Sequence, residues 1–121
     1  MPTKGSILIV DDSRVSRMMT AALIHEQRPS WEIVEAGNSD EALALIEQQP
    51  VDFFSIDFNM PGLNGLDLIK LVKSRCPNAK IVLFTANTQD SIQRKTNQSG
   101  AVCINKPITK QSINQILEFF S

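Results

Sequence analysis

Three short apolar runs of this sequence each end at charged residues that could do chemistry. The runs are residues 7–10, 51–56 and 101–104. Asp11 and Asp12 follow the first run, Asp57 follows the second, and Lys106 follows the third. If the runs are parallel strands of one sheet, these side chains lie at its carboxyl edge, where open α/β sheets place their sites. Carboxylates and an amine gathered there predict a magnesium and phosphoryl site.

The charges of such a cluster limit what it can do. Three carboxylates within about 4 to 6 Å repel one another by roughly 3 to 4 kcal/mol per close pair at an effective dielectric of 20, so a cation must lie among them. Mg²⁺ prefers oxygen ligands and leaves coordination positions for phosphate oxygens. Asp57 stands alone before a turn, which makes it the candidate for an exposed nucleophile that accepts a phosphoryl group as an acyl phosphate. Lys106 adds a fixed positive charge, and Thr85 can donate a hydrogen bond to the transferred group.

Each of these residues also has an ordinary structural interpretation. An Asp11-Asp12 pair before a helix is, taken alone, more often a helix cap and a partner of the helix dipole than a metal site. Lys106 could be a solvated strand end, and Thr85 a turn hydroxyl. Separate strands that each end in a residue type needed by one phosphoryl site are hard to obtain by chance, so the combination favours the functional interpretation.

The composition fits one domain spanning residues 1–121. The chain has 42% apolar residues and a net charge of -1, so it can bury roughly two-thirds of its unfolded surface and offers no basic stripe to a nucleic-acid backbone. No apolar run is long enough for a transmembrane helix or a signal peptide. We therefore expect a cytoplasmic protein without direct nucleic-acid binding or membrane insertion. Cys76 and Cys103 lack metal-ligand spacing, and we expect two reduced thiols.

Short apolar runs alternate with helical stripes along the chain, which predicts five βα units and an α/β fold. The expected strands are residues 7–10, 31–36, 51–57, 80–85 and 101–104. The expected helix caps are Ser13, Asn38, Asn64 and Thr109. Asn38 with Glu41 resembles a capping box. In the first helix, one face carries Val15, Met18, Met19, Ala22 and Leu23.

The segment between Asp90 and Gly100 differs from the other helices because Ile92 is its only apolar residue. Packing can hold such a helix only weakly, so we expect it to be mobile. A solvated helix without a function explains the same composition. Trp31 is predicted to be a packing residue.

Motifs spread over nearly the whole chain identify a known family. They are residues 7–13, Asp57 followed by Met60-Pro61-Gly62 and Gly65, Thr85-Ala86, Gly100-Ala101, and Lys106-Pro107. In this combination the sequence resembles the receiver domain of two-component response regulators, the CheY-like family. The resemblance implies a flavodoxin-like (βα)5 fold, a doubly wound parallel sheet with strand order 2-1-3-4-5.

The same resemblance implies a role for each site residue. Asp57 would be the phosphoacceptor, while Lys106 and Thr85 would hold the phosphoryl oxygens. The Mg²⁺ ligands would be Asp12, Asp57, Asp11 largely through water, and the backbone carbonyl of Asn59. The donor would be a phosphohistidine on a sensor histidine kinase or a histidine phosphotransfer protein. The output would be a conformational shift toward a downstream target protein.

The sequence departs from the family pattern at Cys103, where receivers commonly carry Tyr or Phe three residues before the lysine. A buried Cys is usually a small hydrophobe, so the usual aromatic switch is missing. We therefore expect signalling to run through Thr85, Ala86 and the helix after Asp90.

Other classes of protein fit the residues less well. A flavodoxin would need a hydroxyl- and glycine-rich phosphate loop where Asp11 and Asp12 stand. A metal-dependent phosphohydrolase would need an acid-base carboxylate at Asn59. A receiver-like interaction module that works without phosphorylation stays open, because the aromatic is missing. We expect no enzymatic activity beyond the domain's own phosphorylation and dephosphorylation, and no attached DNA-binding output domain.

Overall fold

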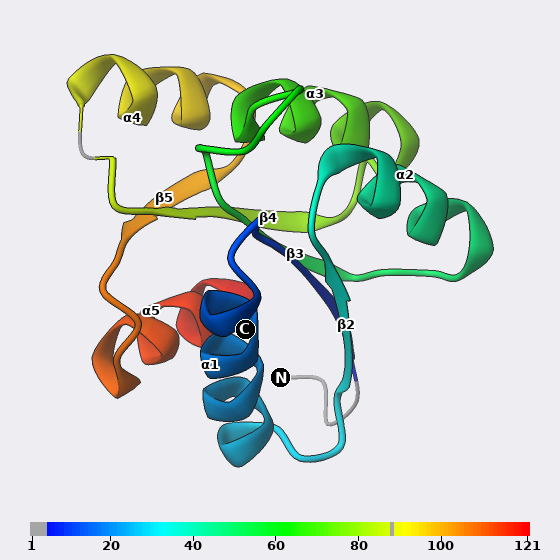
Figure 1. Ribbon diagram of the computed structural model, residues 1–121, viewed down its shortest axis with the longest axis vertical. Coiled ribbons are helices and arrows are strands. Elements are labelled where there is room, and N and C mark those ends of the chain that lie inside the picture. The colour runs from blue at the N-terminus through cyan, green and yellow to red at the C-terminus, as the bar shows by residue number, and fades with distance from the viewer. Residues whose placement is uncertain (1–4, 88) are drawn as a thin grey trace.

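The computed structural model describes residues 5–87 and 89–121 as five strands alternating with five helices (Figure 1). The strands are β1 (Ser6–Val10), β2 (Glu32–Ala36), β3 (Phe53–Ile56), β4 (Lys80–Thr85) and β5 (Val102–Asn105). The helices are α1 (Arg14–Gln27), α2 (Ser39–Gln48), α3 (Gly65–Arg75), α4 (Asp90–Gln98) and α5 (Lys110–Phe120). The predicted alternation of strands and helices is confirmed.

The strands form one parallel sheet in the order β2-β1-β3-β4-β5, which confirms the flavodoxin-like topology. From β1 the chain adds β2 on one side of the sheet and then β3, β4 and β5 on the other side. In doubly wound sheets, ligands bind at the carboxyl ends of the two strands where this change of side occurs, here β1 and β3. Val10 and Ile56, the last residues of these two strands, are paired in register. The residues that follow both strands therefore enter the same crevice.

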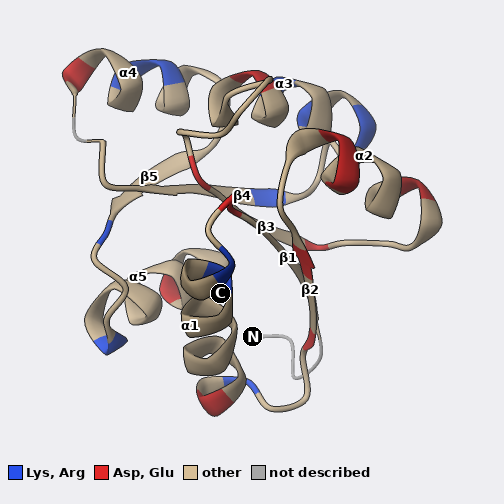
Figure 2. Ribbon diagram, viewed as in Figure 1, with Lys and Arg blue, Asp and Glu red and all other residues tan. Residues whose placement is uncertain are grey.

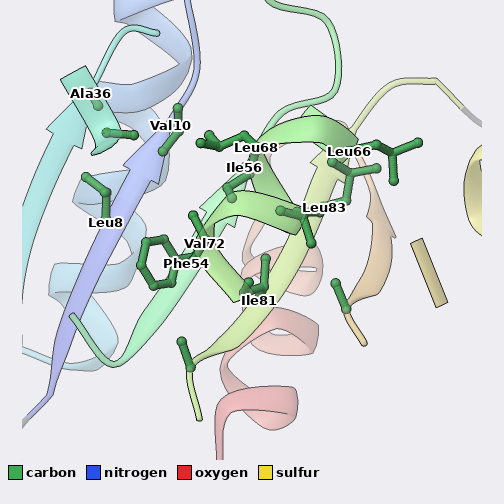
Figure 3. Packing of buried hydrophobic residues seen from close by; sticks show 14 of the residues in the cluster. Leu8, Val10, Ala36, Phe54, Ile56, Leu66, Leu68, Val72, Ile81 and Leu83 are labelled. Atoms are coloured by element: carbon green, nitrogen blue, oxygen red, sulfur yellow. The ribbon is translucent and has the colours of Figure 1, made fainter. Parts of the chain in front are cut away.

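Helices cover both faces of the sheet (Figure 1), with α1 and α5 on one face and α2, α3 and α4 on the other. Each face has its own apolar cluster. Figure 3 shows Val72 of α3 close to Phe54 of the sheet, and both side chains are fully buried. On the other face Trp31 stacks on Phe53 with ring centroids 4.7 Å apart, as a packing residue should. Full burial of such side chains stabilises by roughly 1.5 to 3 kcal/mol each, which holds the sheet and its edge in place.

Four helices begin at the predicted caps. The side chains of Ser13, Asn38, Asn64 and Thr109 each accept a hydrogen bond from the backbone N–H three residues later. The capping box predicted at Asn38 is wrong in one detail, because the Glu41 carboxylate accepts from the N–H of Gly37, at 2.6 Å. Gly37 has no side chain to keep that carboxylate away.

The apolar face predicted for α1 is its exposed face. Val15, Met18 and Met19 are 65, 54 and 48% exposed. Of the predicted face only Leu23 packs on the core, where it is half-buried. The helix buries Thr20 and Ile24, with Arg17 and Ala21 half-buried beside them. In Figure 2 the middle turns of α1 are tan, between charged turns at its two ends. The face toward the sheet is therefore less apolar than the face toward solvent, so the apolar stripe does not mark the core side of this helix.

α4 is held to the domain by few side chains. Ile92 and Thr96 are its buried residues, and the Thr96 hydroxyl donates to the Ile92 carbonyl at 2.6 Å. The N-cap residue, Gln89, makes no side-chain capping bond to a described residue. This agrees with the weak packing read from the sequence, while the mobility of the helix stays a prediction.

Candidate metal and phosphoryl-transfer site

The carboxyl ends of β1 and β3 bring three acidic side chains together. Asp11, Asp12 and Asp57 each offer a carboxylate oxygen, and these oxygens all lie within 4.8 Å of one another. The N–H of Asp57 donates to the carbonyl of Val10 at 2.9 Å, which fixes the end of β3 against the end of β1. The cluster thus lies at the crevice where the strand order reverses.

Asp11 and Asp12 have very different surroundings. Asp11 is 5% exposed, and its two carboxylate oxygens accept hydrogen bonds from the N–H of Ser13 at 2.9 Å and from the amine of Lys106 at 2.8 Å. Asp12 is exposed, and no described residue donates a hydrogen bond to its carboxylate. Asp12 can therefore bind a ligand without giving up an existing contact.

Lys106 lies between two of the carboxylates. Its Nζ is 2.8 Å from Asp11 Oδ2 and 3.4 Å from Asp57 Oδ2. Burial lowers the pKa of Lys106, but the hydrogen bond and charge of Asp11 and the charge of Asp57 outweigh burial, so the pKa is raised above the usual 10.5. The ammonium is therefore a fixed positive charge at neutral pH, and it offsets part of the repulsion among the carboxylates.

The backbone around Lys106 ties two strand ends to each other. The N–H of Lys106 donates to the carbonyl of Thr85 at 2.9 Å, and the Lys106–Pro107 peptide bond is cis. Thr85 pairs in register with Asn105, so β4 and β5 end side by side. Lys106 directly follows β5, and from there its side chain reaches Asp11 and Asp57 after β1 and β3.

Asp57 is less exposed than the sequence indicated, since its side chain is only 12% exposed. The physical reason is that the Lys106 side chain, itself 16% exposed, lies against it. Gly65, at the start of α3, packs directly on the same residue, because a Cβ at Gly65 would collide with the backbone carbonyl of Asp57. The N–H of Gly65 also donates to the carbonyl of Phe58 at 2.9 Å. The loop after Asp57 therefore folds back tightly over the strand end.

Thr85 is fully buried, and its Oγ1 accepts a hydrogen bond from the N–H of Asn87 at 3.2 Å. Ala86 beside it is exposed. Asn59 is exposed in the loop after Asp57, and its role as a metal ligand stays a prediction. Cys103 is half-buried in β5, where burial raises the pKa of its thiol, so the thiol is protonated at neutral pH and behaves as a small hydrophobe.

Arg17 is the residue near the site that the sequence analysis missed. Its Nη1 donates to the backbone carbonyl of Asp11 at 2.6 Å, and its Nε donates to Glu35 at 3.2 Å. The sequence places Arg17 on the same helix face as Thr20, Ala21 and Ile24. That face was not singled out as the buried one because the opposite face is more apolar.

The donor set fits a hard divalent cation. All three side chains offer carboxylate oxygens, which Mg²⁺ prefers over nitrogen and sulfur. Both oxygens of Asp11 already accept hydrogen bonds, which favours contact with a metal ion through water. Asp12 and Asp57 are the better placed for direct coordination.

Comparison with known proteins agrees with this geometry. The family model described as response regulator receiver domain matches residues 7–118. The chain belongs to this receiver domain family. CheY of Thermotoga maritima is 34% identical to it over 96 residues, with 78% of each chain covered. The solved structure of the chemotaxis response regulator CheY4 of Vibrio cholerae has a TM-score of 0.86 at 25% identity, covering 98% of this chain and 99% of that one. A phosphoacceptor role is consistent with the receiver family.

Some relatives are much longer than this chain. The transcriptional activator ExaE of Pseudomonas putida is 28% identical over 95 residues, which is 78% of this chain but only 44% of that protein. The receiver family thus includes parts of larger regulators. None of the helices in residues 5–87 and 89–121 combines the length and apolar character that a membrane span requires.

Proposed function

We propose that this receiver domain takes a phosphoryl group from a phosphohistidine onto Asp57. A carboxylate oxygen of Asp57 attacks the phosphorus, the P–N bond to the donor imidazole breaks, and the imidazole leaves with the bonding electron pair and takes up a proton. The products are an acyl phosphate and a neutral histidine. The observation that carries the proposal is the position of Lys106, whose Nζ lies 2.8 Å from Asp11 and 3.4 Å from Asp57 beside the acidic cluster.

The residues of the site neutralise the charge of the phosphoryl group and position it. Lys106 keeps its proton and donates to a phosphoryl oxygen in place of Asp57. The hydroxyl of Thr85 donates to another oxygen. Asp12, Asp57 and the Asn59 carbonyl would hold the metal ion, with Asp11 acting through water. Bound Mg²⁺ supplies positive charge that offsets the charge of the transferred group. The domain then catalyses only its own phosphorylation and the later hydrolysis.

The phosphodonor is a sensor histidine kinase or a histidine phosphotransfer protein, and the exposed apolar face of α1 supports contact with such a protein. Val15 lies three residues after Asp12, so this face begins beside the acidic cluster. A protein that delivers a phosphohistidine to Asp57 has to approach over the same sheet edge. Burial of Val15, Met18 and Met19, which are exposed in the free domain, would stabilise that complex.

The signal is a population shift between two packings of the domain. The charge on Asp57 favours conformations in which Thr85 and Lys106 contact the phosphoryl group. Thr85 Oγ1 accepts from the N–H of Asn87, so movement of the hydroxyl is transmitted to the loop that leads into α4. We place the output there because Cys103 stands in the position of the usual aromatic. The target is a protein that recognises the altered surface.

The test is the intact mass of the purified protein after incubation with Mg²⁺ and acetyl phosphate, with the Asp57→Asn variant in parallel. One phosphoryl group gained by the parent, and by neither the variant nor the parent in EDTA, supports the proposal. A parent that gains no phosphoryl group from acetyl phosphate, nor from autophosphorylated histidine kinases, would favour the phosphorylation-independent interaction module instead.

A further inference from the structure

We propose that Arg17 is a positioning residue that orients Asp12 toward the metal ion by holding the backbone carbonyl of Asp11. The inference rests on the proposed function, since it concerns the same metal site. The hydrogen bond from Arg17 Nη1 to that carbonyl is 2.6 Å long. The Arg17 side chain is only 17% exposed, and its Nε donates to Glu35 at 3.2 Å.

The carbonyl of Asp11 controls the direction of Asp12 through the peptide bond. The Asp11 carbonyl and the Asp12 N–H belong to one rigid plane, so a bond that fixes the carbonyl also fixes where the Asp12 backbone begins. The Asp12 side chain is exposed and accepts no hydrogen bond from a described residue. Asp11 has Ser13 and Lys106 to hold its carboxylate, whereas Asp12 depends on its backbone alone.

The guanidinium is itself held in place from two further sides. Glu35 is in β2, paired in register with Ile9 of β1, so the ion pair anchors Arg17 to the sheet. A Cβ at Gly37 would lie 3.2 Å from Nη1, which shows that the guanidinium packs closely over the Gly37 backbone. The planar guanidinium can donate to the Glu35 carboxylate and to the Asp11 carbonyl at the same time. A lysine ammonium cannot make this pair of hydrogen bonds with the same geometry.

Two other effects of Arg17 would not weaken Mg²⁺ binding when the residue is removed. An ordinary ion pair with Glu35 would affect only the stability of the fold. The positive charge of Arg17 close to the carboxylates disfavours a second cation, so its loss through charge alone would strengthen Mg²⁺ binding. Weaker Mg²⁺ binding after removal of Arg17 therefore follows only from the positioning role.

The experiment is a Mg²⁺ titration of the folded protein, followed by the backbone amide NMR signals of the β1–α1 loop and the loop after β3. The variants are Arg17→Gln, Arg17→Lys and Arg14→Gln. Arg14 is exposed on the same helix and has no hydrogen bond to the Asp11 carbonyl, so its variant removes the same charge without the contact. We expect the Mg²⁺ dissociation constant to rise about tenfold in Arg17→Gln, as for other residues that orient metal ligands. It should rise less in Arg17→Lys and stay equal or fall in Arg14→Gln.

An unchanged or lower dissociation constant in Arg17→Gln would overturn the inference. If that variant does not fold, Arg17→Lys decides, because it keeps the charge and loses the fork; a parent-like constant there overturns the inference too. A parent that binds no Mg²⁺ removes the metal site of the proposed function together with this inference. A parent that binds Mg²⁺ and is phosphorylated, beside Arg17 variants that bind equally well, removes only the role of Arg17.

Discussion

Lys106 lies between two carboxylates that would otherwise repel each other, and they in turn strengthen its hold on its proton. The pKa of Lys106 is raised in the folded protein above the usual 10.5, because Asp11 and Asp57 outweigh the effect of burial. The site therefore keeps its fixed positive charge over the whole physiological pH range.

The raised pKa predicts how stability changes at alkaline pH. The contribution of Lys106 is complete below the pKa of the unfolded chain and is lost as the pH rises through the higher pKa of the folded state. We expect the free energy of unfolding, measured with urea in EDTA from about pH 9 to 12, to fall more steeply for the parent than for Lys106→Met. Parallel pH curves for the two proteins would contradict the ion pairs described for Lys106.

At the scale of elements, α1 has its less apolar face toward the sheet and its more apolar face toward solvent. We expect Ile24→Ala to lower the free energy of unfolding by about 2 to 5 kcal/mol, because it empties space in a fully buried position. Met18→Gln should change that free energy by no more than about 0.5 kcal/mol, because Met18 is 54% exposed. Urea unfolding of both variants is the check, and a larger loss from Met18→Gln would show that the face is buried.

The exposed face of α1 also predicts a functional difference. Met18→Glu should slow phosphoryl transfer from a histidine kinase that phosphorylates the parent and leave phosphorylation by acetyl phosphate unchanged, because only the protein donor covers this face. Leu71→Glu is the matched control, since Leu71 is 36% exposed on α3. Equal slowing by the two variants, or slowing with acetyl phosphate, would argue against contact at α1.

The elements of this fold could be predicted more completely than the side-chain arrangement of the site. The helix caps follow from local patterns such as Asn64, whose short side chain suits a helix start, whereas the strand order was implied only by the resemblance to receiver domains. The burial of Asp57 could not be predicted, because it depends on Lys106, which is distant in sequence. Arg17 was missed because the opposite face of α1 is more apolar, and because its contacts with the Asp11 carbonyl and with Glu35 of β2 form only in the folded chain.

On the scale of the whole molecule, the hydrogen bond from the Asn87 N–H to Thr85 joins the site to the loop before α4. Thr85 is fully buried beside Lys106, and its hydroxyl contacts the loop before α4. α4 itself is anchored by Ile92 and Thr96. A weakly packed helix responds to small changes in its flanking loop more readily than the rest of the fold does.

Amide hydrogen exchange tests this coupling. On phosphorylation we expect the exchange rates of α4 to change, while those of α2, which covers the same sheet face farther from Thr85, stay the same (Figure 1). Thr85→Ala should abolish the response of α4, because the hydroxyl links the two regions. Exchange in α4 that is unaffected by phosphorylation would contradict the proposed route.

The measurement that tests the account most directly is the location of the phosphoryl group. Borohydride reduces an acyl phosphate to the alcohol, so it permanently marks the residue that carried the phosphoryl group. Trypsin cleaves after Arg14 and Arg17, which places Asp57 in a different peptide from Asp11 and Asp12. After incubation with Mg²⁺ and acetyl phosphate, we predict reduction at Asp57 alone. A mark on Asp11 or Asp12, or on no aspartate in protein that has gained a phosphoryl group, would contradict the account.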